Sequence, residues 1–125
     1  MFYMTTKNDQ PNKWDVQLRK GTLELVILGV MSGRKVYGLE ILKSLHLLPT
    51  MQITEGTLYP LLDRLKREGV IAAEWVQSGE SRPRKYYHLT ETGESKLKLL
   101  RERWRQSVSD IEFLLNNPGP KPLDQ

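Results

Sequence analysis

The segment ITEGTLYPLLDRLKREG, residues 53–69, restricts the fold of this chain more than any other stretch. Its leucines recur at spacings of three and four residues, which places them on one face of an amphipathic helix. Gly56 and Pro60 lie on the opposite side, although they cost a helix interior about 1 and about 3 kcal/mol. The sequence therefore predicts a well-marked helix whose outer face needs a separate explanation.

Both ends of this helix are marked. Thr54 is a favourable N-cap residue, and Ile53 and Leu58 occupy the two positions of a hydrophobic staple. Gly69 fits the left-handed position that follows a helix, with Val70 able to pack back on the last turn. We therefore expect the helix to run between Thr54 and Gly69.

Two further helices precede it. Residues 14–31 predict one helix, which is apolar nearly all round over residues 23–31 and is therefore expected to be deeply buried. Ser32 and Gly33 end it. Residues 36–48 predict a second helix with one apolar face, and Pro49 stops it.

The periodicity changes after Gly69. The stretches VIAAEWVQ (residues 70–77) and RKYYHL (residues 84–89) are rich in β-forming residues, and the intervening SGESRP is rich in turn residues. This pattern predicts a two-stranded hairpin with a long polar tip. Trp75, in its first strand, is expected to pack beneath the hairpin.

A long helix is expected from Thr90, its N-cap, to residue 117. Apolar residues repeat along it at spacings of three and four, which makes a heptad-like seam. The seam consists of Leu97, Leu100, Trp104, Val108, Ile111 and Leu115.

The order helix, helix, helix, hairpin, helix predicts a mainly α protein with a small β-hairpin. It is typical of a winged helix-turn-helix followed by a long C-terminal helix. We expect a flexible N-terminal arm over residues 1–13, the winged helix over 14–89, the dimerisation helix over 90–117 and a disordered Pro-rich tail over 118–125.

The outer face of the third helix has two interpretations. In a helix-turn-helix this face enters the major groove of DNA. Gly56 would let the backbone approach another surface, and Pro60 leaves the carbonyl of Gly56 without its usual helical partner. The alternative is that Pro60 only kinks an exposed helix. Charge does not decide, because residues 54–68 carry three basic and three acidic side chains.

The hairpin tip is more basic, with Arg82, Arg84 and Lys85 against Glu80. A basic wing beside a reading helix would hold DNA phosphates. The alternative is a solvated turn without a partner.

Composition excludes several classes of function. A formal charge of +4 admits an anionic partner, while the absence of cysteine excludes disulfides, thiolate catalysis and cysteine-ligated metal. His46 and His88 lie far apart, and neither a Gly-rich phosphate loop nor a paired-carboxylate pattern is present, so we expect no enzyme activity, no cofactor and no metal site. With no signal peptide and no apolar run long enough for a bilayer, we expect a cytoplasmic protein without a membrane partner.

Three stretches carry a resemblance to a known family. LRKGTLELVILGVMSGRKVYGLEILKSL, ITEGTLYPLLDRLKREGVI and SRPRKYYHLTETG resemble, in this order, the PadR family of transcriptional regulators. The resemblance covers about residues 18–115 and implies a winged-helix homodimer that binds pseudo-palindromic operator DNA, usually as a repressor. It also implies a short form with a single C-terminal helix. In this family, effectors such as phenolic acids or hydrophobic drugs loosen the grip on DNA.

The resemblance assigns DNA contacts to the reading helix and its surroundings and to the wing. Lys66 stands where a carboxylate is common, so no role is carried onto it. The assigned residues are Tyr37, Glu55, Gly56, Thr57, Tyr59, Pro60, Arg64 and Arg67 around the helix, and Arg82, Arg84 and Lys85 on the wing.

The seam of the last helix is predicted to pack against a second copy of the chain, with intrachain core as the alternative. Trp104 lies in mid-seam, where some family members have an aromatic residue that lines a ligand cavity between subunits. Trp104 is therefore the candidate contact for a planar aromatic effector, or else a large core residue.

Two other functions remain open. A winged-helix module that binds protein rather than DNA would need an apolar outer face, and Asp63, Arg64 and Arg67 argue against one. A DNA-binding regulator without any ligand would be controlled by its amount alone.

Overall fold

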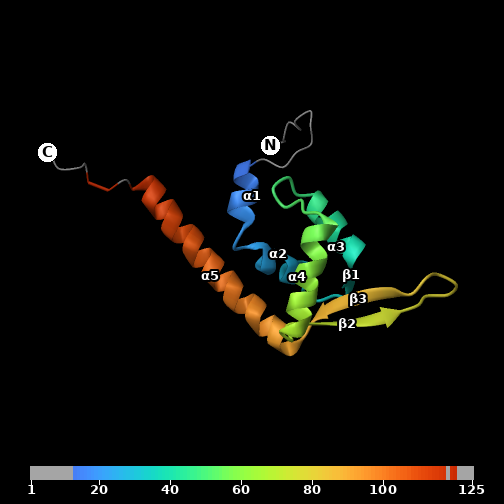
Figure 1. Ribbon diagram of the computed structural model, residues 1–125. Helices are drawn as coiled ribbons and strands as arrows, with labels where there is room; N and C mark the ends of the chain where they lie inside the picture. The colour runs from blue at the N-terminus through green and yellow to red at the C-terminus, as the bar shows by residue number, and fades with distance from the viewer. Residues whose placement is uncertain (1–12, 118, 121–125) are drawn as a thin grey trace.

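The computed structural model describes residues 13–117, 119 and 120, and this part of the chain forms five helices and three strands (Figure 1). They are, in order, α1 (Lys13–Arg19), α2 (Leu23–Val30), β1 (Val36–Tyr37), α3 (Gly38–His46), α4 (Glu55–Arg67), β2 (Ile71–Val76), β3 (Arg84–Leu89) and α5 (Glu91–Asn116). The predicted arm over residues 1–13 lies outside the described residues except for Lys13, and so does the predicted tail over 118–125 except for residues 119 and 120.

The prediction of one helix over residues 14–31 is wrong. Gly21 adopts a positive φ of 80°, which ends α1 and lets the chain turn before α2 begins. The Thr22 hydroxyl donates to the carbonyl of Arg19 within this turn, at 3.1 Å. Arg19 in turn donates to the carbonyl of Thr50, at 2.9 Å, so α1 is tied to the loop between α3 and α4.

The core lies where α2, α3 and α4 meet the sheet. The side chains of Leu58, Leu62 and Leu65 on α4 are completely buried, which confirms the apolar face predicted for this helix. Ile41, Leu42 and Leu45 of α3 are also buried against them. By contrast, only Ile27, Leu28 and Met31 are buried in the stretch over residues 23–31, so its expected burial all round is wrong.

The two ends of α4 differ in how they are capped. At its C-terminal end Gly69 has a φ of 77° and donates to the carbonyl of Lys66, while Val70 donates to that of Leu65, as expected for a left-handed cap. At the other end Thr54 is the N-cap residue, as predicted. Its hydroxyl lies 3.4 Å from that of Thr57, and within the described residues it accepts no capping hydrogen bond from the backbone.

The wing belongs to a three-stranded antiparallel sheet in the order β1-β3-β2. β2 and β3 pair from Ile71↔Leu89 to Val76↔Arg84, which confirms the hairpin. The sequence does not predict β1, whose two residues pair with Tyr86 and Tyr87 of β3. The expectation for Trp75 is also wrong, because its side chain is 70% exposed.

A tight joint connects the turn after α4 to the start of α5. The Thr90 hydroxyl accepts from the Gly93 amide at 3.0 Å and donates to the Gly69 carbonyl at 2.7 Å. The Thr90 amide donates to the Val70 carbonyl at 3.1 Å. A Cβ on Gly93 would lie 1.8 Å from this same Val70 oxygen, so only glycine fits here. The joint therefore fixes the direction in which α5 leaves the winged helix.

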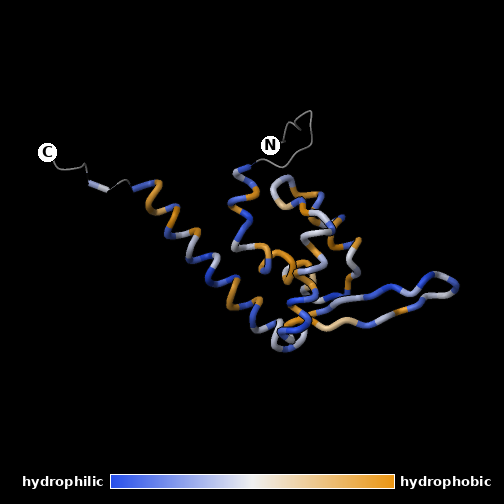
Figure 2. The backbone as a smooth tube through the Cα atoms, viewed as in Figure 1, coloured by the Kyte–Doolittle hydropathy of each residue, from blue (hydrophilic) through white to orange (hydrophobic). Residues whose placement is uncertain are grey.

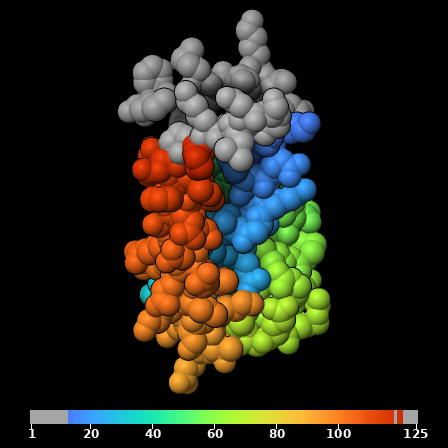
Figure 3. All heavy atoms as spheres, turned by 90° about the vertical axis from the view of Figure 1, so that its left-hand side faces the viewer, coloured from blue at the N-terminus to red at the C-terminus, as the bar shows by residue number. Residues whose placement is uncertain are grey.

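The two halves of α5 have different surroundings. Leu97 and Leu100 are half-buried against the core, and the helix packs there on α2. From Arg101 onward every described α5 side chain is exposed, and the helix runs away from the rest of the chain (Figure 1). Apolar positions continue into this part of α5 (Figure 2). In Figure 3, α5 (orange to red) lies on the face of the molecule that is turned toward the viewer, and its outer surface is uncovered there.

Candidate nucleic-acid interface

The outer face of α4 is formed by Gly56, Pro60, Asp63 and Arg67, all of which are exposed. Pro60 lies inside the helix, where it provides no N–H for the carbonyl four residues earlier. A Cβ added to Gly56 would meet only the Thr54 hydroxyl, at an ordinary 3.7 Å. Packing within the described chain therefore does not require glycine here. The lack of a side chain leaves the first turn of α4 open to another molecule.

Tyr59 joins α4 to the start of α3. A Cβ on Gly38 would lie 2.1 Å from the Tyr59 hydroxyl oxygen, so this tyrosine occupies the space that the glycine leaves. The Tyr59 side chain still has 40% of its surface exposed. It can therefore hold the two helices of the helix-turn-helix together and present one edge of its ring to a ligand.

Arg64 is engaged by carboxylates from two helices. It donates to Glu68 at 2.8 Å and to Glu24 of α2 at 3.2 Å. These two hydrogen bonds raise the pKa of Arg64, and the bond to Glu68 has the larger effect. The hydrogen bond between Arg64 and Glu68 also lowers the pKa of Glu68. Lys96 of α5 lies 2.5 Å from Glu24 and 3.7 Å from Glu68. Arg64 thus belongs to an ion-pair cluster that links α2, α4 and α5.

The wing places its basic residues on different faces. Arg84 lies 4.6 Å above the ring of Tyr37, and Tyr37 packs edge-on against Tyr86 with ring centroids 5.4 Å apart. Lys85 lies on the other face of β3, with its ammonium 5.8 Å from the centre of the Tyr87 ring. Arg82 is exposed in the connection between β2 and β3.

The predicted DNA-binding residues therefore fall into groups according to the element on which they lie. Five of them line the exposed side of α4, while Tyr37 and Arg84 form a stacked pair on the sheet. The five are Glu55, Gly56, Thr57, Pro60 and Arg67. β2 and β3 extend sideways from near the C-terminal end of α4 (Figure 1), so the hairpin stands next to this helix.

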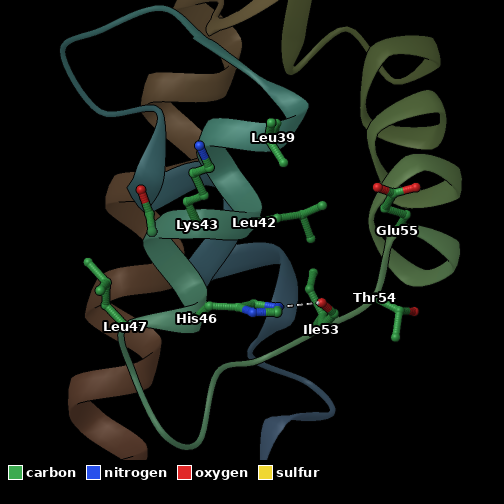
Figure 4. A pocket seen from close by; sticks show the side chains of 9 residues that line it. Leu39, Leu42, Lys43, His46, Leu47, Ile53, Thr54 and Glu55 are labelled. Carbon is green, nitrogen blue, oxygen red and sulfur yellow. Dashed lines mark hydrogen bonds between the residues drawn. The ribbon is translucent and has the colours of Figure 1, made fainter.

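A groove of about 690 Å³ lies between α3 and the start of α4 (Figure 4). Leu39, Leu42 and Leu47 line its α3 side, and Thr54 and Glu55 line the other. The His46 ring nitrogen Nε2 lies 3.2 Å from the Ile53 carbonyl oxygen, which bridges the turn of the helix-turn-helix. Nothing in the sequence around His46 predicts this contact.

A second cavity, of about 370 Å³, lies between α2 and α5. Its walls are Leu25, Val26 and Gly29 of α2 with Leu97, Arg101 and Trp104 of α5, together with Thr22, Ser32 and Met51. Trp104, the predicted effector contact, is therefore beside a hollow within a single chain, with 47% of its surface exposed.

Comparison with protein families identifies the chain. Residues 27–99 match the Transcriptional regulator PadR-like family. The chain belongs to this family. PadR-like proteins are transcriptional regulators and not enzymes, and DNA binding through a winged helix is typical of them.

Solved PadR-family structures share the fold of this PadR-like chain. A PadR-like transcriptional regulator from Bacillus cereus is 34% identical, with a TM-score of 0.73, and the match covers 83% of this chain and 99% of that one. A PadR family regulator from Eggerthella lenta is 35% identical, with a TM-score of 0.72 and coverage of 82% and 88%. An uncharacterised protein from Lysinibacillus sphaericus is 30% identical over 77% of this chain and 90% of its own length.

The described residues contain neither a candidate membrane span nor a candidate metal cluster. None of the described helices is long and apolar enough to cross a membrane. Within the same residues no group of three or more His, Cys, Asp or Glu side chains could hold a metal ion.

Proposed function

We propose that this PadR-like protein is a cytoplasmic homodimeric repressor that binds a pseudo-palindromic operator and is released by a planar aromatic effector. The observation that carries the proposal is the pairing of an open, polar outer face on α4 with a basic wing beside it. α4 would enter the major groove with its N-terminal turn first, and the wing would contact the backbone.

The roles of the DNA-contacting residues differ. Gly56 and Pro60 let the backbone of α4 approach the groove, and Glu55, Thr57 and Arg67 are the exposed side chains along it. Tyr59 would reach the DNA with the exposed edge of its ring. Arg82, Arg84 and Lys85 would bind phosphates, with Tyr37 holding Arg84 in place through the stacked contact. Arg64 would position α4 through Glu24 and Glu68 as well as face the DNA.

The uncovered half of α5 supports the dimer. Trp104, Val108, Ile111 and Leu115 continue the seam beyond the part that packs on the core, and all four are exposed. Exposed apolar rows of this kind are costly in water and are typical of surfaces that pack against a partner. A second copy related by a two-fold axis would cover them and would present two reading helices about 34 Å apart, one turn of DNA.

The cavity beside Trp104 supports an effector. An indole next to an apolar hollow between α2 and α5 can stack on a flat ring. Because α5 also carries the dimer seam, a ligand here could change the spacing of the reading helices. It would control DNA binding only if it bound the DNA-free geometry more tightly.

A protein-binding module is the alternative function, and the outer face of α4 speaks against it. Asp63 and Arg67 are charged and exposed, and Gly56 and Pro60 offer little apolar surface to a protein partner.

The proposal is tested by fluorescence anisotropy with a labelled duplex from upstream of the protein's own gene and a shuffled duplex of equal length. Arg67→Ala should weaken binding to the first duplex by about 1–3 kcal/mol and to the shuffled one by less. Lys98→Ala, which removes a charge from α5, is the matched control and should change neither. Equal affinity of the unchanged protein for both duplexes would contradict operator recognition.

A further inference from the structure

Lys96, near the start of α5, joins the ion-pair cluster around Arg64 from a third helix. Its ammonium lies 2.5 Å from Oε2 of Glu24 and 3.7 Å from Oε1 of Glu68. Arg64 binds the other oxygen of each carboxylate, Oε1 of Glu24 at 3.2 Å and Oε2 of Glu68 at 2.8 Å. A lysine of α5 and an arginine of the reading helix α4 therefore share the same two carboxylates.

The charges of the cluster balance only while Lys96 takes part. Two carboxylates then face two cations, and without the lysine one negative charge is in excess. Glu24 needs a cation most, because only 19% of its side chain is exposed and an unpaired charge with little access to water is costly. Without Lys96, Arg64 has to serve both carboxylates and is held more firmly against them. Lys96 therefore leaves Arg64, whose side chain is 44% exposed, freer to turn to a DNA phosphate.

The pair of Lys96 and Glu24 also joins the two helices that form the second cavity. Leu25 of α2 and Leu97 of α5 line this cavity, and each directly follows a member of the pair in the chain. Because the pair crosses from one wall of the cavity to the other, a ligand that moves α5 relative to α2 changes the distance between its two members.

The fixed N-terminal end of α5 determines how far each part of the helix moves. The Thr90 hydroxyl donates to the Gly69 carbonyl at 2.7 Å and holds this end. At 1.5 Å of rise per residue, Lys96 lies about 9 Å and Trp104 about 21 Å along the helix from Thr90. A shift of about 2 Å at Trp104 therefore moves Lys96 by about 1 Å. Such a movement weakens an ion pair formed at 2.5 Å.

We propose that Lys96 is a positioning residue that keeps Arg64 available to a DNA phosphate, and that the cavity between α2 and α5 acts on Arg64 through the pair of Lys96 and Glu24. This inference rests on the proposed function and deepens it, because it names how an occupied cavity reaches the reading helix within one subunit. An occupant that parts Lys96 from Glu24 leaves Arg64 to the carboxylates and an excess negative charge beside the DNA. Both effects lower the affinity, as release of a repressor requires.

The role of Lys96 is tested by anisotropy of the labelled upstream duplex. Lys96→Met should weaken binding about tenfold, the loss of one charge-assisted hydrogen bond from Arg64. Lys96→Arg should keep most of the affinity. Lys98→Met removes an exposed charge from the same helix and should change little. Unchanged affinity of Lys96→Met would overturn the proposal.

A sodium chloride series separates positioning from a general loss of structure. Lys96→Met and Arg64→Ala should each flatten the slope of log affinity against log salt by about 0.9 per subunit, because each removes the same phosphate contact. Together they should flatten it no further. Slopes that add in the double variant would mean that Lys96 contacts its own phosphate, and they would overturn the positioning role.

A charge-balanced background guards against variants that do not fold. In Glu24→Gln one carboxylate is gone, so Arg64 and Glu68 remain balanced without the lysine. Lys96→Met should then cost almost no affinity, and circular dichroism checks that every variant folds. A tenfold loss in this background as well would contradict an action of Lys96 through the shared carboxylates.

Gly29 allows the cavity to be filled without a ligand. It lines the cavity from α2, and a Cβ added to it would meet no atom of the described chain within 4 Å apart from its neighbours along the helix. Gly29→Phe, or Gly29→Met as a second filling variant, should weaken operator binding by about fivefold or more, the lower end of typical coupling between sites. Gly29→Ala is the matched control and should change little.

The filled cavity should have almost no further effect when Lys96 is already methionine. Equal weakening by Gly29→Phe in both backgrounds, or no weakening by either filling variant, would overturn the route through Lys96. A protein that prefers the upstream duplex to the shuffled one while these tests fail loses only this route. A protein that does not distinguish the two duplexes loses the proposed function together with it.

Discussion

The winged helix and the second half of α5 use the same apolar spacing with opposite results. On α4 the leucines three and four residues apart are completely buried, as Leu62 shows. On α5 the same spacing leaves Ile111 56% exposed and Leu115 69% exposed. The spacing therefore predicts an apolar face and says nothing of what covers it. We therefore propose that the first region folds the monomer and that the uncovered second region serves assembly.

The largest expected effect is on the stability of the winged helix. Leu62→Ala should lower the free energy of unfolding by about 2–5 kcal/mol, because it leaves a cavity in a closed core. Ile111→Ala, a substitution of similar size in the second half of α5, should change the stability of the monomer by less than about 0.5 kcal/mol. Urea denaturation at several protein concentrations separates the stability of the monomer from the stability that dimerisation adds. Equal losses in the two variants at every concentration would remove the contrast.

The next effect is on assembly. Val108→Lys with Ile111→Lys should raise the dimer dissociation constant by about 100-fold or more, because four ammonium groups would enter an apolar interface. Light scattering during size exclusion measures the mass. Glu102→Lys with Ser109→Lys, at polar positions of the same helix, is the matched control and should remain a dimer. An unchanged protein that is monomeric at micromolar concentration would refute the dimer.

A smaller effect is expected at the joint between the two regions. Gly93→Ala should cost about 1–3 kcal/mol, because its Cβ would collide with the Val70 carbonyl and force α5 to move. Glu94→Ala in the same turn should cost far less. The joint sets the direction of α5, so Gly93→Ala should also weaken operator binding more than its loss of stability explains. Thermal melts and anisotropy measured on the same samples test both effects.

The smallest effect is the pH dependence of the ion-pair cluster that links α5 to the winged helix. Arg64 lowers the pKa of Glu68 in the folded protein, so the unfolded chain binds this proton more readily. The contribution of Glu68 is therefore present above the ordinary pKa of a glutamate and is lost as the pH falls through the lowered value. Denaturation midpoints of the unchanged protein and Glu68→Gln should differ slightly at pH 7 and converge below pH 4. A constant difference would contradict the ion pair.

Local signals predicted much of the fold. The apolar face of α4, the left-handed Gly69, the hairpin and the Thr90 cap each depend on residues within a few positions of one another, and each is confirmed. The fold class follows from the order of these elements. Gly21 marks the break between α1 and α2, but a single glycine costs a helix only about 1 kcal/mol and does not by itself predict a break.

Contacts between distant residues could not be predicted in this way. β1 has two residues and no periodicity of its own, and it exists only because β3 pairs with it. Arg64 meets Glu24 across 40 positions, and Gly93 meets Val70 only once the sheet has formed. For the same reason, the sequence pointed to Tyr37 and Arg84 as separate DNA contacts but had no signal that the two side chains would stack on each other.

Hydroxyl-radical footprinting on the DNA upstream of the protein's own gene tests the division between reading and assembly most directly. Two reading helices held by paired α5 helices should protect two patches about one turn, or 10 base pairs, apart on one face of the duplex. The Val108→Lys/Ile111→Lys variant should lose this paired pattern while its winged helix stays folded. A single protected patch for the unchanged protein, or the same paired pattern for the monomeric variant, would contradict the account.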